Sequence, residues 1–245
     1  MIYINSIADM IEFIRACDKY ELDCASSINF RMPNYEISPK EFLEFADIDL
    51  RDTTVKGKVG AVSNLKRALD CQLDMFFEAI NIKSIFDSKN LKFSKKIQFL
   101  SDIGMLLTKS MNKLNTIRNR MEHNYLVPTI EDLEVYYEMV WNVIEIINLN
   151  VHIMKMGEIR YEASAGQEKF YIVNGYDISK RSFWFKITQR KTRDTNSIIK
   201  SLYKQDDYTE YVRAFQVFRC NIGFSESENA KEYKKRLKEI SLIDI

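Results

Sequence analysis

The spacing of apolar residues changes at Gly157, and this change limits the folds that the chain can adopt. Before Gly157 apolar side chains recur every three or four residues, which is the spacing of amphipathic helices. After it they alternate, which is the period of strands with one buried face. Three segments alternate in this way: Ile159–Ala163, Phe170–Val173 and Phe183–Ile187. The pattern predicts a mainly α protein, with a helical bundle over residues 1–156 followed by a small α+β domain with an antiparallel sheet over residues 157–245.

The sequence predicts two helix N-termini in the first part of the chain. Ser6 precedes an apolar pattern of helical spacing and has Asp9 three residues later, which indicates a capped helix start. We expect this first helix to end between residues 21 and 26. Ser38 followed by Pro39 indicates a second start, because proline is favoured at the first helical position.

Longer helices are expected further along. The strongest amphipathic segment is 61–82, and a helix capped by Thr129 is expected to run to about Met156. The whole chain of 245 residues has only 7 glycines and 3 prolines. This scarcity of turn formers favours long helices over a sandwich or barrel with many tight turns.

The second part combines turn signals with further helical segments. Ala165-Gly166-Gln167 and Asn174-Gly175 are typical of turns between strands. A helix is expected over 195–203, the segment 211–220 is ambiguous between strand and helix, and 227–240 is expected to form a charged surface helix.

Cysteine spacing and hydropathy limit the compartment. The four cysteines form no C-x-x-C pair and have no histidine at zinc spacing, so we expect free thiols in a reducing compartment. No basic segment precedes an apolar run at the N-terminus, and no run of about 18 apolar residues occurs. The sequence predicts a cytoplasmic protein with no membrane contact.

Charge is divided unevenly along the chain. Residues 1–156 hold 19 Lys and Arg against 22 Asp and Glu, while residues 157–245 hold 17 against 13. Six cations and no acidic residue fall within 180–193, around Phe183, Trp184 and Phe185. Such a segment is either a nucleic-acid surface or a core strand followed by a solvated basic loop.

The segment 115–128 carries the candidate chemistry. It contains His123, one of two histidines in the chain, with Arg118 five positions earlier. On a straight helix this separation places the two side chains about 140° apart. They can therefore converge only over a helix end, across a kink, or against a second copy of the same helix.

Arg118 followed by Asn119, three further residues and then His123, between two helices of a bundle, resembles the HEPN family. Tyr125 extends the match to the Arg-x4-His-x-Tyr form found in HEPN toxins that are paired with minimal nucleotidyltransferases. The resemblance covers residues 6–156 and does not reach the C-terminal part.

The resemblance implies a metal-independent endoribonuclease that uses the ribose 2′-hydroxyl, without a cofactor, in a homodimer whose two motifs face each other. Arg118, Asn119 and His123 are then the catalytic residues. Histidine suits proton transfer near neutral pH, and a guanidinium suits charge building on a phosphorane-like transition state. Substrate contacts are expected from five residues: Arg120, Tyr125, Arg190, Lys191 and Arg193.

Other interpretations stay open at this point. Glu122 can pair with Arg118 or Arg120 while His123 caps the last carbonyl groups of a helix, which makes the segment a structural network. The chain is then a non-catalytic HEPN-like dimer whose C-terminal module binds nucleic acid or a protein. Tyr125 is a packing residue, a substrate contact or a site of nucleotidyl modification. If the protein acts in a toxin-antitoxin system or in antiphage defence, the implied partner is an antitoxin or a nucleotidyltransferase. His152 is expected to be a capping or surface histidine.

Overall fold

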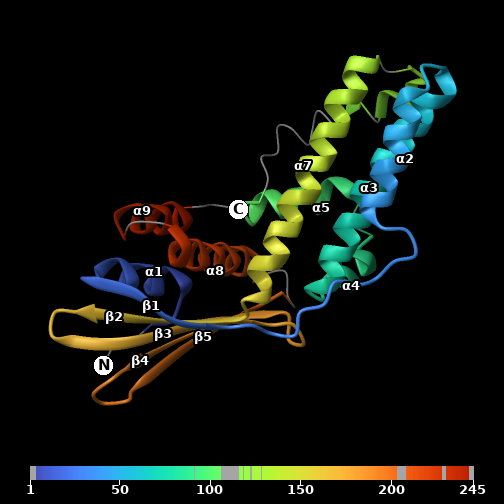
Figure 1. Cartoon of the computed structure of the whole chain (residues 1–245). Coiled ribbons are helices and arrows are strands. Elements are labelled where there is room, and N and C mark those ends of the chain that lie inside the picture. The colour runs from blue at the N-terminus through green and yellow to red at the C-terminus, as the bar shows by residue number, and fades with distance from the viewer. Residues whose placement is uncertain are drawn as a thin grey trace. The chain divides into compact units, whose positions relative to one another are not determined.

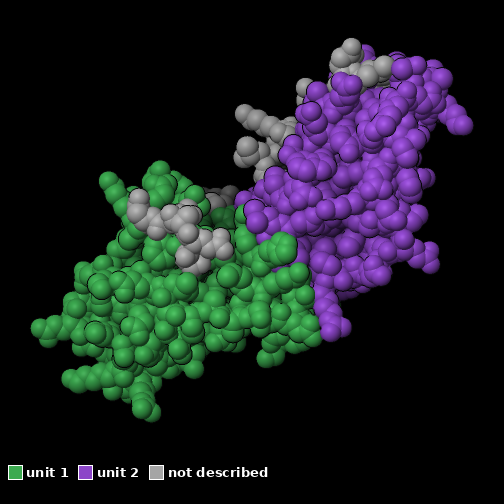
Figure 2. All heavy atoms as spheres, viewed as in Figure 1, with its two compact units in different colours: residues 1–30, 152–245 green, residues 31–151 purple. Residues whose placement is uncertain are grey.

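The computed structural model describes residues 4–90, 92–105, 116–117, 119–121, 123–127, 129–202, 208–227 and 230–242. The chain divides into two compact units (Figure 2). Unit 1 consists of residues 1–30 and 152–245, and unit 2 consists of residues 31–151. None of the helices in the described part of the chain combines the length and the apolar character that crossing a membrane requires.

Unit 1 is built on a five-stranded antiparallel sheet with strand order β1-β2-β3-β4-β5 (Figure 1). Its elements are α1 (Ile7–Ala16), β1 (Lys19–Ser26), β2 (Glu158–Ala165), β3 (Glu168–Asp177), β4 (Ser182–Gln189), β5 (Thr195–Ser201), α8 (Tyr208–Ser227) and α9 (Ala230–Ser241). The helices α1, α8 and α9 cover one face of this sheet (Figure 1). The strands β2 to β4 have the period-two alternation that such a half-covered sheet requires.

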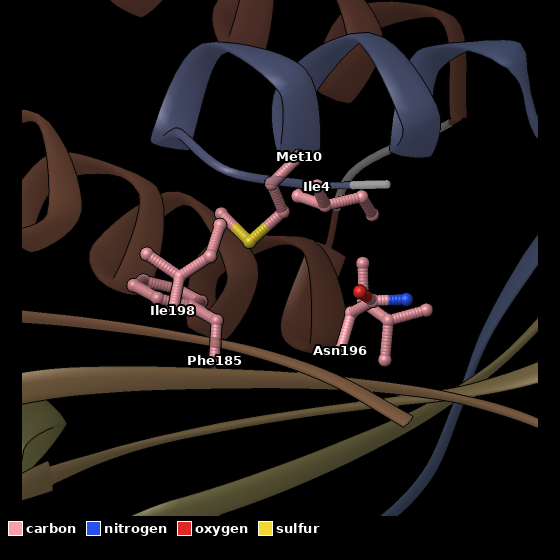
Figure 3. Close-up of a pocket in the computed structure, with 6 residues that line it drawn as sticks. Ile4, Met10, Phe185, Asn196 and Ile198 are labelled. Atoms are coloured by element: carbon pink, nitrogen blue, oxygen red, sulfur yellow. The ribbon is translucent and has the colours of Figure 1, made fainter. Parts of the chain in front are cut away.

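The core of unit 1 lies between the sheet and these helices. Phe183 of β4 is fully buried and its ring contacts three rings of α8, with centroid distances of 4.9 to 5.3 Å. Closer to the N-terminus, α1 packs on β4 and β5 through a seam lined by Ile4, Met10, Phe185, Ile187, Asn196 and Ile198 (Figure 3). This seam leaves no room for a water molecule, so it holds no ligand cavity.

Three stacked tyrosines attach β1 to the rest of unit 1. The Tyr20 ring lies 4.5 Å from the Tyr161 ring of β2 and 5.1 Å from the Tyr233 ring of α9, measured between centroids, with an interplanar angle of 14° in both cases. Tyr20 is the one buried residue of β1, whose other side chains are exposed. A mostly charged and polar edge of this kind disfavours pairing with a further strand.

The predicted helical bundle followed by a small α+β domain is wrong. The protein is a mixed α+β protein, and its sheet begins in the N-terminal 30 residues. The first helix ends at Ala16 rather than between residues 21 and 26, and Lys19–Ser26 forms a strand. This strand escapes detection because a single buried side chain, Tyr20, gives the segment neither a helical nor a strand period.

Two other local predictions in unit 1 are also wrong. Residues 195–201 form β5 instead of a helix, with Ile198 buried while Ile199 is 64% exposed on the opposite face. Gly175 lies within β3 rather than in a turn, directly opposite Trp184 of β4. A Cβ atom at Gly175 would fall 2.6 Å from the Trp184 indole, so the indole occupies the space above this glycine. The strands β2 to β4, the turn at Gly166 and the helix α9 confirm the remaining predictions.

The described secondary structure of unit 2 is helical. Its elements are α2 (Pro39–Arg51), α3 (Val55–Ala79), α4 (Lys83–Ser88), α5 (Phe93–Asp102) and α7 (Ile130–Lys155), of which the residues from His152 onward count with unit 1. Ser38 caps α2 through a reciprocal capping box with Glu41, and Ser6 makes the same arrangement with Asp9 in unit 1. Both predicted helix starts are therefore confirmed.

Aromatic packing and polar contacts hold the helices of unit 2 together. Phe77 of α3 stacks on Phe86 of α4 at 4.6 Å and meets Phe99 of α5 edge-on at 5.6 Å. The Gln72 amide of α3 donates a hydrogen bond of 3.1 Å to the Asn148 side chain of α7. These contacts fix α3 as the helix on which the others pack.

Two glycines let the end of α2 approach the start of α3. A Cβ atom at Gly57 would fall 2.2 Å from the carbonyl oxygen of Asp52 and 2.7 Å from that of Asp49. A Cβ atom at Gly60 would meet the Asp49 carboxylate at 2.6 Å. The atoms opposite Gly57 belong to the backbone and cannot move aside without shifting the helix.

We therefore expect Gly57→Ala to destabilise the protein by about 1–3 kcal/mol, the usual cost of overpacking. Gly223→Ala is the matched control, because Gly223 lies in α8 with no atom within 4 Å of the added Cβ. That change is expected to stabilise by about 0.5–1 kcal/mol, because alanine is the better helix residue. Urea denaturation followed by far-UV circular dichroism measures both, and an unchanged midpoint for Gly57→Ala would contradict the close approach.

Candidate functional site

The segment 115–128 lies between α5 and α7 and is described only in part. Its helical residues are Thr116, Ile117, Asn119–Met121, His123 and Asn124. The described residues do not include Arg118, Glu122 or Pro128. That Arg118 and His123 act together in one catalytic site therefore stays a prediction.

The helical part of this segment ends at Tyr125. Tyr125 adopts φ 56°, a left-handed conformation that is uncommon for residues other than glycine. The chain turns back there, and the Leu126 N–H donates a hydrogen bond of 3.3 Å to the Arg120 carbonyl oxygen. The Tyr125 side chain is 88% exposed, which argues against the packing role and leaves it accessible to a ligand or an enzyme.

Asn119 and Arg120 are the described neighbours of His123 on the helix surface. Asn119 precedes His123 by four residues and Arg120 by three, which places them about 40° and 60° away around the helix axis. All three residues are exposed. Helical spacing thus brings Arg120 to the same face as the histidine. The sequence already indicates this neighbour, because Arg120 precedes His123 by three residues.

The basic segment 180–193 divides between the core and the surface. Phe183 and Phe185 point into the core and are at most 1% exposed. Trp184 lies between them on the other side of the sheet, where it is partly exposed. Arg190, Lys191 and Arg193 occupy the turn between β4 and β5, and all three are exposed. The segment is therefore a core strand followed by a solvated basic turn, with Trp184 on the face of the strand that points away from the core.

The face of the sheet that points away from α1, α8 and α9 carries a second group of chemically distinctive residues, which we call the open sheet face. It is defined by Arg160, Tyr171, Trp184, Lys186, Arg190 and Ile199. The strand register places Trp184 beside Ile199 and places Lys186 beside Val173. Sequence reasoning missed Arg160 and Tyr171, although the alternation in β2 and β3 could have assigned both to this face.

Tyr171 is flanked by two guanidinium groups. Arg190 lies 4.9 Å and Arg160 lies 5.3 Å from the centre of its ring. The Arg190 guanidinium is also 3.3 Å from the Glu162 carboxylate, and Arg160 lies 2.5 Å from the Asp23 carboxylate. The hydrogen bond to Asp23 raises the pKa of Arg160. These contacts hold the arginine planes in fixed positions on an otherwise solvated surface.

Metal ligands do not gather in the described part of the chain. No group of three or more His, Cys, Asp and Glu side chains there could hold a metal ion. The described cysteines, Cys17, Cys24, Cys71 and Cys220, are all free, and burial raises the pKa of the Cys17 thiol to about 11.

Comparison of the chain with protein-family models, with curated proteins and with solved structures yields no match. The resemblance to the HEPN family therefore stays a prediction that rests on the residues of segment 115–128.

Proposed function

We propose that the protein is a metal-independent endoribonuclease of the HEPN type, which cleaves RNA through the ribose 2′-hydroxyl. One observation carries the proposal: His123 is exposed near the end of a helix, with Asn119 and Arg120 one turn earlier on the same face and Tyr125 exposed just beyond it. A proton-transfer group, an amide and a guanidinium on one solvent-facing surface suit a phosphodiester.

The chemistry assigns a role to each group. Neutral His123 takes the proton of the 2′-hydroxyl, and the 2′-oxygen then attacks the adjacent phosphorus. The bond from phosphorus to the 5′-oxygen breaks, and that oxygen receives a proton from a second, protonated imidazole. The products are a 2′,3′-cyclic phosphate and a 5′-hydroxyl. Arg118 or Arg120 offsets the charge that builds on the phosphoryl oxygens, and Asn119 orients the histidine or the phosphate.

A homodimer supplies the second imidazole. Support comes from unit 2, which holds 11 of the 14 large apolar side chains found exposed among the described residues. On α7 these include Val135, Trp141 and Leu149, of which Trp141 is 48% exposed. Exposed apolar side chains that gather into one patch mark surfaces that another protein covers. A symmetric pairing of two copies through unit 2 would cover it and bring two motifs together.

The setting of this activity is also part of the proposal. Tyr125 is accessible as a substrate contact or as a site for modification by a nucleotidyltransferase partner, which fits a toxin-antitoxin or antiphage defence system. The free thiols fit the cytoplasm. Arg190, Lys191 and Arg193 are proposed to hold RNA through its phosphates.

The cleavage test uses the two histidines of the chain. Purified protein should cut a single-stranded RNA in the presence of EDTA, and His123→Ala should lower the rate by about 100-fold or more, the usual contribution of a general acid or base. His152 is exposed near the end of α7 and serves as the matched control, so His152→Ala should keep the wild-type rate. Gel analysis of the products should find cyclic phosphate ends. Cleavage that survives His123→Ala, or that disappears with EDTA, would sink the proposal.

The dimer has a separate test. Trp141→Glu places a charge in the proposed interface, so it should weaken dimerisation by at least about tenfold and lower cleavage with it. Leu242 is 70% exposed in unit 1, and Leu242→Glu should leave both properties unchanged. Sedimentation velocity measures the association. A wild-type protein that cleaves RNA while remaining a monomer would contradict the composite site.

A further inference from the structure

The open sheet face pairs aromatic rings with cations on strands that a nucleic acid can reach. The Trp184 ring lies against Gly175 of β3. Tyr171 lies four residues before this glycine on the same strand, and its ring is contacted by Arg160 and Arg190. Four residues of a strand span about 13 Å. Lys186 of β4 is exposed. It pairs with Val173, which stands halfway between Tyr171 and Gly175 on β3, so Lys186 lies between the two rings. The face thus alternates ring, cation, ring.

The surrounding charge favours an anionic ligand. Strands β3 to β5 with their turns, residues 168–201, carry eight Lys and Arg against three Asp and Glu, a net charge of +5. The charges of residues 1–156 sum to −3, so this excess is local to β3 to β5 and their turns. Ile199 is the one large apolar side chain of the open sheet face that is exposed among the described residues, at 64%. Apolar contact area is therefore small, and charge with ring stacking has to supply the affinity.

We propose that the open sheet face binds single-stranded RNA, with one base stacked on Trp184, a second base stacked on the Tyr171–Arg190 pair, and Lys186 contacting the phosphate between them. Unpaired bases expose the ring faces that such stacking needs, whereas bases in a duplex do not. Because Arg190 and Arg160 already fix the Tyr171 ring, little side-chain freedom is lost on binding. This binding does not require cleavage, so it stands whether or not His123 is catalytic.

The test measures binding of a fluorescein-labelled 12-nucleotide oligouridine to the full chain carrying His123→Ala, by fluorescence anisotropy at low salt. In this background Trp184→Ala should weaken binding about tenfold, since one stacked base contributes on the order of this factor. Lys186→Ala should weaken it severalfold and reduce the salt dependence by about one phosphate contact. Lys238 is exposed on α9, on the covered side of the sheet, and Lys238→Ala is the matched control that should bind as the parent does.

Tryptophan fluorescence gives a second measurement that does not depend on a damaging substitution. The chain has two tryptophans, so Trp141→Phe leaves Trp184 as the sole reporter, and saturating oligouridine should quench it. Trp184→Phe leaves Trp141, whose emission should not change. Circular dichroism of every variant checks folding.

Three results would overturn the proposal. They are an unquenched Trp184 at saturation, equal affinity of Trp184→Ala and its parent, and binding of a 12-base-pair RNA duplex as tightly as the single strand. The binding assay uses the His123→Ala background, so a failure of the cleavage proposal would not change its results. A failure of the binding proposal would in turn leave the cleavage assay of His123 unchanged, so each proposal can be rejected on its own.

Discussion

The pairing of β1 with β2 is the interaction on which the architecture depends. It joins Lys19–Ser26 to Glu158–Ala165, antiparallel, across more than a hundred residues of sequence. In the sequence, all of unit 2, residues 31–151, is inserted between these two strands, which are neighbours in the sheet. The tyrosine stack of Tyr20, Tyr161 and Tyr233 stabilises the junction from the covered side of the sheet. Without the pairing of β1 with β2, the sheet would lose the edge strand β1.

This half-covered sheet also decides where ligands can bind in unit 1. The covered side is filled by aromatic and aliphatic side chains, and the seam beneath α1 excludes even water. The proposed RNA contact lies on the other side of the same strands, where alternation places Trp184, Lys186 and Tyr171. The strand β4 serves both purposes, because Phe183 and Phe185 anchor it to α8 and α1 while Trp184 faces outward.

Sequence reasoning found the elements whose burial is strongly periodic. α3 and α7 have wide apolar stripes, and β2 to β4 have clear alternation, so their type was predictable. The segments β1 and β5 were not, because edge strands bury few side chains, and the adjacent Ile198 and Ile199 mimic a helical stripe. Gly175 was wrongly predicted to lie in a turn. A glycine is needed there because the Trp184 indole of the neighbouring strand occupies the space of a Cβ atom. No local pattern reveals a cross-strand contact of this kind.

For the candidate site, the sequence indicated His123 and the basic segment but not their surroundings. The proximity of Asn119 and Arg120 to His123 follows from helical spacing, whereas the left-handed turn at Tyr125 does not follow from any rule for tyrosine. The Tyr171 ring between Arg160 and Arg190 depends on strand register, which the misplaced turn at Gly175 concealed.

The central proposal is that single-stranded RNA contacts two places, the open sheet face of unit 1 and the residues around His123 in unit 2. Photocrosslinking of a 4-thiouridine-labelled single-stranded RNA to the full chain carrying His123→Ala, followed by mass spectrometry of the crosslinked peptides, tests it most directly. The account predicts crosslinks within β3 and β4, at or next to Tyr171 and Trp184, and within residues 116–127. Crosslinks confined to α1, α8 and α9, on the covered side of the sheet, would contradict it.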